Sequence, residues 1–346
     1  IYLPIFVLVS LVFLVFFVVG DMFDISKTAI ANSIDLKIML SYFENIIPFY
    51  FVKYILPISN LLTVFISVGL LMKHNELIAL RACGIAPSFI FRTIIIFSII
   101  LVALSIYLSI DYVPKHKHRA RNIKNYDIKL KKQNPKIIYD VFLNFTNNYS
   151  LSADLFDYNT NKFENITITK ISAAKILERI DAKLCVYQNN SWIMFDVIKR
   201  KWIDDVEQPS EKFKIFNLTQ ECGFTDTPHD IFILNDFQIK DKDEMTYKEL
   251  QSYRAIMKKR GFSENWILTD LYYMFSFPFS NLILVLFALP IAIHSSKNNI
   301  AFGFGLSLMI FFCFWIVIYI CVTLGHREML LSFVVTNIIN FLFLIF

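Results

Sequence analysis

The sequence predicts an α-helical polytopic membrane protein, with six transmembrane helices arranged three plus three around an inserted β-sandwich or jelly-roll domain. Three long apolar runs come first, a mostly polar stretch follows, and three more apolar runs end the chain. Each run is close to the roughly 17–25 residues that a helix needs to cross a bilayer core. None of the runs contains Asp, Glu, Lys, Arg or His: Ile1 to Val19, Tyr54 to Met72, Thr93 to Ile110, Leu271 to Ile293, Ile300 to Leu324 and Met329 to Phe346.

The composition agrees with lipid as the solvent for much of the chain. Hydrophobic residues make up 56% of the sequence and charged residues only 18%, which is more apolar surface than a soluble fold of this length could bury. An isolated segment in hydrocarbon can satisfy its backbone polar groups only as a helix. Because the chain begins on Ile1 and ends on Phe346, both inside apolar runs, we expect that both ends are trimmed.

The charges of the short loops predict the orientation of the helices. Cytoplasmic loops retain Lys and Arg, whereas short translocated loops do not. The loop from Lys73 to Arg92 carries three basic residues against the single acid Glu76, so we expect it in the cytoplasm. The loop expected after the first run is rich in Asp and Glu, which fits the outer side. Alternation then places both termini inside and the polar insertion outside.

A basic run follows the third apolar run and has two interpretations. A solvated helical continuation of the third span is one; a contact with anionic headgroups or an anionic substrate is the other. Long translocated domains are largely exempt from the charge rule, so the run does not contradict the orientation. Its members are Lys115, Lys117, Arg119, Arg121 and Lys124.

The polar insertion reads mainly as β-sheet, and we divide the chain into residues 1–112, 113–265 and 266–346. Short segments rich in Ile, Val, Tyr, Phe and Thr alternate with turn residues such as Asp157 to Asn161 and Gln188 to Ser191. This pattern favours a small sandwich or jelly roll over βαβ units. The expected strands are Ile137 to Phe145, Tyr149 to Phe156, Phe163 to Ile171, Ala174 to Ile180, Lys183 to Tyr187, Trp192 to Lys199 and Phe213 to Leu218.

A helix near residues 246–260 is predicted to lead back to the membrane. Thr246 and Glu249 have the spacing of a capping box, and Gly261 suits the position after a helix end. Cys185 and Cys222 share the insertion, so a disulfide between them and two free thiols are both compatible with the sequence.

Motifs for catalysis are missing from the chain. It contains no G-x-x-x-x-G-K-[ST] phosphate loop, no H-E-x-x-H zinc helix, no G-x-S-x-G elbow and no C-x-x-C pair. The sequence therefore predicts neither an enzyme nor a bound cofactor or metal. Asp270, at the outer edge of the fourth span, is either a wet interfacial or helix-start residue or part of a substrate path.

The expected cytoplasmic loop carries the strongest local signal. Residues 75–84 read as a short amphipathic helix with Glu76 in its first turn and Leu77, Leu80 and Arg81 at helical spacing. Gly84 suits the end of this helix. A short helix between two spans on the cytoplasmic face is typical of a docking element.

With these features the chain resembles the LptF/LptG permeases, also called the YjgP/YjgQ family, which export lipopolysaccharide. The three-plus-three topology around a periplasmic jelly roll matches over essentially the whole chain. The matching segments are Asn75-Glu-Leu-Ile-Ala-Leu-Arg-Ala-Cys-Gly-Ile85, Thr227-Pro-His-Asp230 and the span-four segment from Phe277 to Ile291.

The resemblance implies half of an ABC transporter that extracts lipopolysaccharide, or a similar anionic lipid, from the bacterial inner membrane. Its implied partners are a second LptF/LptG-type permease, a cytoplasmic ABC ATPase dimer and a periplasmic bridge protein of the LptC/LptA type. Glu76 matches the acid of the family's coupling helix, with Leu77, Leu80 and Arg81 beside it. Family members use basic residues near the outer end of span one to contact lipid phosphates, and here Lys27 is the candidate.

Two other classes of function stay open on the sequence. A non-transporting membrane sensor or scaffold would bind a ligand with its outer β-domain and would not depend on an ATPase. A membrane enzyme acting on lipid would need converging titratable groups, which we cannot assemble from these residues.

Overall fold

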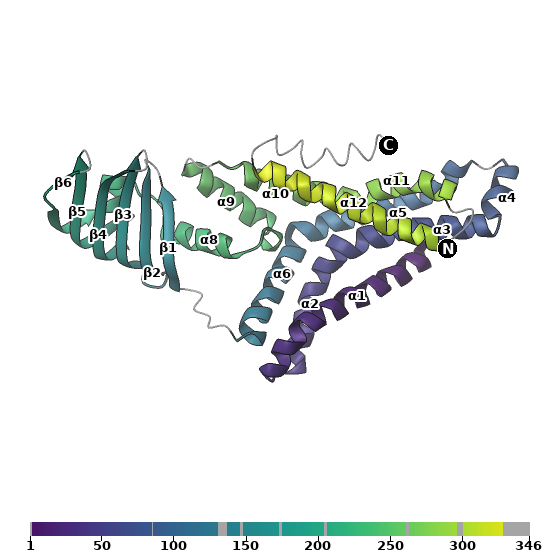
Figure 1. Ribbon diagram of the computed structural model, residues 1–346, viewed down its shortest axis with the longest axis horizontal. Helices are drawn as coiled ribbons and strands as arrows, with labels where there is room; N and C mark the ends of the chain where they lie inside the picture. The colour runs from purple at the N-terminus through teal and green to yellow at the C-terminus, as the bar shows by residue number, and fades with distance from the viewer. Residues whose placement is uncertain are drawn as a thin grey trace. The chain divides into compact units, whose positions relative to one another are not determined.

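The computed structural model describes residues 2–84, 86–130, 137–145, 148–172, 175–203, 206–260, 263–295 and 300–327. The chain forms two compact units, whose elements are labelled in Figure 1. The membrane unit comprises Ile1–Lys131, Lys242–Arg254 and Glu264–Phe346, and the β unit comprises Lys132–Asp241 and Ala255–Ser263. The sequence placed the start of the inserted domain at residue 113. The residues from Val113 to Lys131 instead group with the spans, because α6 packs on α2.

The membrane unit is helical, with irregular one-turn segments inside its long helices. Its first half consists of α1 (Tyr2–Ala31), α2 (Leu36–Tyr50), η1 (Phe51–Ile55), α3 (Leu56–Lys73), α4 (Glu76–Ala82), α5 (Pro87–Tyr107), η2 (Leu108–Tyr112), α6 (Val113–Asn122) and η3 (Ile123–Ile128). After the β unit follow η4 (Lys242–Glu244), α9 (Tyr247–Lys259), α10 (Asn265–Ser276), η5 (Phe277–Phe279), α11 (Ser280–Ser295) and α12 (Ile300–His326).

Five helical stretches in the described part of the chain are long and apolar enough to cross a membrane. They are Tyr2–Ala31, Leu36–Lys73, Phe91–Ile128, Asn265–Ile293 and Phe302–His326. The sixth predicted run, Met329 to Phe346, lies outside the described residues. The chain is thus a polytopic helical membrane protein with an inserted β domain.

Spans two and three are each 38 residues long, well beyond their apolar runs. At about 1.5 Å per residue such a helix is roughly twice as long as the bilayer core is thick. The prediction of a loop along the acidic segment after span one is wrong, because α1 continues to Ala31 and α2 begins at Leu36. Tyr42 of α2 donates a hydrogen bond to Asp21 of α1 at 2.6 Å, so an acid counted as a loop charge joins two helices.

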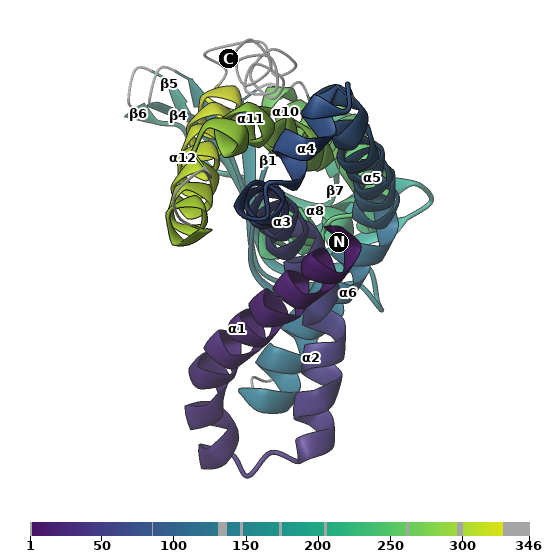
Figure 2. The same ribbon diagram turned by 90° about the vertical axis from the view of Figure 1, so that its right-hand side faces the viewer.

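Span two is the centre of the membrane unit. In its apolar window 78% of the residues are buried, against 17% for α1. Figure 2 shows α3 between α1, α5 and α12, and these helices and α11 pack on it. Span four is interrupted at Pro278, where the 3₁₀ segment η5 separates α10 from α11.

Two asparagines join the spans deep in the membrane unit. The Asn60 side-chain nitrogen donates to Ser98 Oγ at 3.1 Å and to the Asn281 carbonyl at 2.9 Å. The Tyr2 hydroxyl donates to Asn60 Oδ1 at 2.7 Å. These bonds connect α1, α3, α5 and α11 in a region where a polar group without a partner is costly.

The β unit is built on one seven-stranded antiparallel sheet. Its strands follow one another in the order of the sequence from β1 to β6, and β7 pairs with β5. The antiparallel β domain is confirmed, but jelly-roll connectivity is not, because the described strands pair as a meander. The strands are β1 (Ile137–Phe145), β2 (Tyr149–Asp157), β3 (Lys162–Ser172), β4 (Lys175–Gln188), β5 (Ser191–Ile203), β6 (Val206–Glu207) and β7 (Glu211–Asn217).

Most of the predicted strands and turns are confirmed. Asn189 and Asn190 both have positive φ in the turn between β4 and β5, as a tight hairpin requires. The two strands predicted on either side of Asp181 are one continuous strand, β4. The hydrogen bond from Thr167 Oγ1 to Asp181, at 2.8 Å, accommodates this carboxylate within the sheet.

The long strands share a bend at one level of the sheet. Asp140, Asn165 and Asp196 all have φ near the left-handed region and lie at the same level across β1, β3 and β5. At each bend the side-chain alternation skips one step, so that buried residues are three apart and stay on one face, as with Phe163 and Ile166. A bend repeated across neighbouring strands curves the sheet as a whole.

The buried face of the sheet packs against α7 (Leu218–Cys222), which contacts β5, and against the fully buried Phe224, whose ring contacts Phe145 and Trp192; α8 (Pro228–Ile239) follows in the chain. Trp192 is fully buried and its indole N–H donates to the Asp226 carbonyl at 2.7 Å. Thr227 and Asp230 form a reciprocal capping box at the start of α8, which gives a structural reason for the Thr-Pro-His-Asp segment. Cys185 and Cys222 are both free and buried.

Candidate functional site

The short helix predicted between spans two and three is present as α4. It begins at Glu76 and ends at Ala82, and Gly84 follows with a φ of 77°, the left-handed conformation of a helix stop. Leu77 is only 1% exposed, because α4 packs on α3 and α5. The helix is therefore anchored to the bundle through Leu77.

The outward surface of α4 carries both charge and apolar area. Glu76 is exposed, Ile78 is 56% exposed and Leu80 is half-buried. The sequence placed Leu77 on the docking surface; the structure turns it inward and puts Ile78 outward. The side chain of Arg81 lies outside the described residues. A carboxylate beside an exposed aliphatic side chain can bind a partner surface that offers a cation and an apolar pocket.

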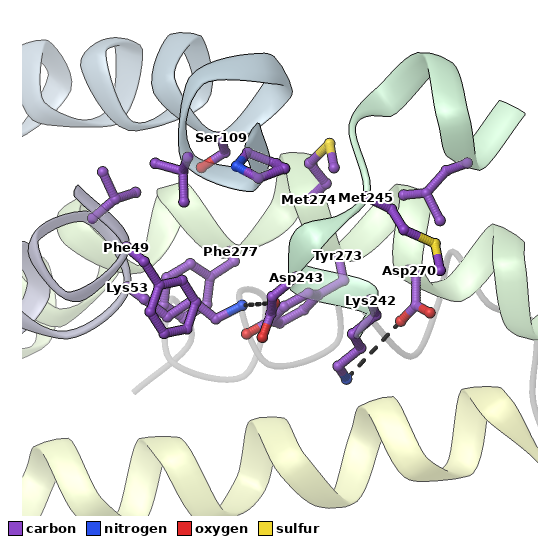
Figure 3. A pocket seen from close by; sticks show the side chains of 14 residues that line it. Phe49, Lys53, Ser109, Lys242, Asp243, Met245, Asp270, Tyr273, Met274 and Phe277 are labelled. Atoms are coloured by element: carbon purple, nitrogen blue, oxygen red, sulfur yellow. Dashed lines mark hydrogen bonds and ion pairs between the residues drawn. The ribbon is translucent and has the colours of Figure 1, made fainter. Parts of the chain in front are cut away.

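A second cluster of charges surrounds η4, the one-turn segment Lys242–Glu244. Asp243 is the central residue of the cluster (Figure 3), with Lys53 Nζ at 2.8 Å from Oδ1 and Lys117 Nζ at 3.4 Å from Oδ2. Lys53 comes from η1 in span two and Lys117 from α6 in span three. One carboxylate therefore joins two different spans.

Glu244 attaches η4 to span three a second time. Its carboxylate lies 2.8 Å from Arg121 Nη1 and 3.4 Å from His118 Nδ1, and its side chain is 1% exposed. Burial of a carboxylate at this depth is costly unless a cation remains beside it. The Arg121 guanidinium supplies that cation from the same face of α6 as Lys117.

Asp270 is buried and joins spans four and five. His326 Nε2, at the end of α12, lies 2.8 Å from Asp270 Oδ1, and Lys242 Nζ of η4 lies 4.0 Å from the same atom. Gly325 permits this approach, because a Cβ there would lie 2.7 Å from Thr269 Cγ2. Asp270 is thus a contact within the bundle, buried beside the side chains of His326 and Lys242.

A small cavity of about 60 Å³ lies between these charges and the helices. The volume is enough for a few water molecules. Figure 3 shows Lys53 and Asp243 on one wall, with Phe49, Tyr273 and Phe277 around the lysine. The lysine nitrogen lies 4.4 Å from the centre of the Tyr273 ring and 5.0 Å from that of Phe277, so the rings stabilise its charge as well. Other lining residues are Val52, Ser109, Val113, Pro114, Lys242, Met245, Leu250, Asp270 and Met274.

The ionisation of Asp243 is controlled by its neighbours. Burial favours the neutral acid, but the charges of Lys53 and Lys117 outweigh it, and together they hold the pKa of Asp243 well below its usual range. The carboxylate is therefore ionised throughout the neutral range, and both ion pairs are formed there.

Four of the five cations in the basic run of span three pair with acids of this chain, and the fifth, Arg119, is exposed. Besides Lys117 and Arg121, Lys115 contacts Asp111 at 2.6 Å and Lys124 contacts Asp24 at 2.8 Å. The helical continuation of span three is confirmed, but its cations are not simply solvated. Lys27 is exposed, and the described residues offer it no ion pair.

Sequence reasoning missed the cluster around η4. Lys53 directly precedes the second apolar run and was read as its boundary, although a lone cation at the end of an apolar run is itself a signal. Asp243 and Glu244 lie far away in the sequence, in a polar stretch with no periodicity. Their pairing depends on the helix packing, which no local pattern encodes.

The comparison with protein families covers both units of the chain. The model of the family described as lipopolysaccharide export system permease LptF/LptG matches residues 1–346. No curated protein matches the chain. The match therefore includes the spans, the β unit and the α4 loop together. The chain belongs to the LptF/LptG family of lipopolysaccharide export permeases.

Proposed function

We propose that the protein is one permease of an ABC transporter that extracts lipopolysaccharide, or a similar anionic lipid, from the inner membrane and passes it to a periplasmic bridge. The observation that carries the proposal is α4, a short helix that is anchored by Leu77 and exposes Glu76 and Ile78 between two spans. A separate cytoplasmic ATPase dimer would dock there, with Glu76, Leu80 and Arg81 in the interface. Leu77 would transmit the motion to α3 and α5.

The complex would contain a second LptF/LptG-type permease and a bridge protein of the LptC/LptA type. We propose a sixth span at residues 329–346, α4 in the cytoplasm and the β unit in the periplasm. Lys27 and Asp270 stay our candidates for the substrate path. Asp270 would act indirectly, through its contacts with His326 and Lys242.

The physical task is to move a lipid with an anionic head and several acyl chains out of a bilayer. Each buried CH₂ group stabilises the lipid in hydrocarbon by about 0.8 kcal/mol, so the chains must pass from one apolar surface to another. The β unit would accept the acyl chains and shield them from water, and its exposed apolar side chains, among them Ile176, Leu177, Phe213 and Ile215, offer part of such a surface.

Charge reversal on α4 tests the proposal. Glu76→Lys should place like charges together at the ATPase interface and lower ATPase co-purification or lipid release by about tenfold, while the permease still inserts and folds. Arg81→Glu should act likewise. Asn159→Ala, at an exposed turn of the β unit, is the matched control and should leave both readouts unchanged. Full ATPase binding and full lipid extraction by Glu76→Lys would contradict the proposal and favour the sensor or scaffold, which needs no ATPase.

A further inference from the structure

Span two changes from α-helix to π-helix beside the small cavity near η4, which we call the outer-end cavity. Phe51–Ile55 form the π-helical segment η1 between α2 and α3, with Pro48 before it and Pro57 after it. A π segment interrupts the regular backbone hydrogen bonds, and each proline removes a donor from the helix. The central span of the bundle is therefore weakest at η1, the segment that carries Lys53.

The attachments of η4 to the two spans are unequal. Span three holds it twice, through Lys117 to Asp243 and through Arg121 to the fully buried Glu244. Among the described residues, span two holds it through one ion pair, Lys53 to Asp243. If the Lys53 contact breaks, Asp243 keeps Lys117, so no carboxylate is left buried without a cation. Breaking the Glu244 contact with Arg121 would leave a buried carboxylate with His118 alone, which is far more costly.

The Lys53 ammonium can also leave Asp243 without losing its contact with water. Its side chain is 15% exposed and lies beside the cavity, and its long aliphatic part can stay on the apolar wall while the ammonium reaches water.

The positions at which the chain passes to and from the β unit also distinguish span three from span two. The chain leaves the membrane unit after Lys131, shortly after η3 of span three, and returns at Lys242, the first residue of η4.

We propose that span two hinges at η1, and that the Lys53–Asp243 ion pair is the contact that breaks when the outer-end cavity opens, while η4 stays attached to span three. The inference rests on the proposed transport function, of which it describes one conformational step. Span three and η4 then move together and carry both of these chain connections to the β unit. α2 stays packed on α6, and the bend of span two at η1 regulates access to the cavity.

Two cysteine pairs test which contact must break. Lys53→Cys with Asp243→Cys bridges span two to η4, and Arg121→Cys with Glu244→Cys bridges span three to η4. Both pairs are made with Cys83→Ser and Cys313→Ser, which remove exposed thiols. Each is joined by a short bis-methanethiosulfonate reagent in the complete transporter in proteoliposomes. Lipid release per ATP hydrolysed is measured before bridging, after bridging and after reduction.

The bridge from residue 53 to residue 243 should lower release by about tenfold, and reduction should restore it, because the step it blocks belongs to the cycle. The bridge from residue 121 to residue 244 should change release less than about twofold. Release that survives the first bridge, or equal loss with both bridges, would overturn the hinge. No release from the unbridged native complex would instead refute the transport function.

A second measurement needs no transport. Lys53→Met removes the ion pair but keeps the aliphatic packing, and Ser109→Cys places a thiol on the cavity wall. Together they should raise the labelling rate of residue 109 about fivefold over Ser109→Cys alone, because the open state becomes more populated. Lys124→Met, which removes a cation paired with Asp24 away from the cavity, is the matched control. An unchanged labelling rate with Lys53→Met would contradict the hinge.

Discussion

Replacing Arg260 by Met should strongly destabilise the β unit, because Arg260 is a buried cation with a buried partner. Its guanidinium pairs with the Asp226 carboxylate, and the two side chains are 6% and 5% exposed. A second nitrogen donates to the Asn144 carbonyl of β1 at 3.4 Å. The substitution leaves Asp226 buried without a cation, which costs about 3–5 kcal/mol.

This cost is a large share of the roughly 5–15 kcal/mol by which a domain is stable. The same Asp226 also accepts the indole N–H of Trp192 on its carbonyl, so its displacement disturbs the centre of the core. Adding Asp226→Asn to Arg260→Met removes the orphaned charge and should recover about half of the loss, since an amide is cheaper to bury than a carboxylate.

Pulse proteolysis of the full-length protein in urea measures the effect, with cleavage sites of the β unit identified by mass spectrometry. The expected order of stability is native, then the double variant, then Arg260→Met. A cost below about 1 kcal/mol for Arg260→Met, the range of an exposed ion pair, would refute the reasoning. So would a double variant that is less stable than the single one.

Three further outcomes follow from a close contact, from the orientation of the chain and from burial. Gly325→Ala should lower the free energy of thermal unfolding by about 1–3 kcal/mol, because its methyl would overlap Thr269. Adding Thr269→Ser should restore part of the loss by removing Cγ2. Equal stability of Gly325→Ala and the native protein would contradict the close crossing. Cys83 should react with thiol reagents only from the cytoplasm, and labelling from outside intact cells would overturn the orientation. Cys222 should stay unlabelled at pH 8 in the folded protein, because burial raises its pKa to about 11, and rapid labelling there would show that the β unit opens.

The features predicted well from the sequence are those made by neighbouring residues. The capping box of Thr246 and Glu249 forms as expected, with the Thr246 N–H donating to Glu249 at 2.7 Å. The hairpin at Asn189 and Asn190 and the stop of α4 at Gly84 depend on single-residue backbone preferences. The spans depend on length and the absence of charge, which lipid enforces on each segment separately.

The features missed from the sequence depend on contacts across the chain. Charge rules treated Asp21 as a loop residue, although Tyr42 binds it between two helices. Helical spacing placed Leu77 on an amphipathic face but could not tell which side of that face meets the bundle. Asp181 looked like a strand break until its partners on the neighbouring strands were known.

Hydropathy and turn chemistry act over a few residues at a time, so they are enough to predict that the chain crosses a membrane, carries an antiparallel β domain and has a short helix between two spans. The family likeness rests on the same local segments. Which charges meet, in contrast, depends on how the helices pack. Lys53 and Asp243 are separated by the whole β unit in the sequence, and their contact exists because helix packing brings η1, α6 and η4 together around one buried carboxylate. Burial then requires that the Asp243 carboxylate keep at least one of these cations, since a charge removed from water must keep a partner.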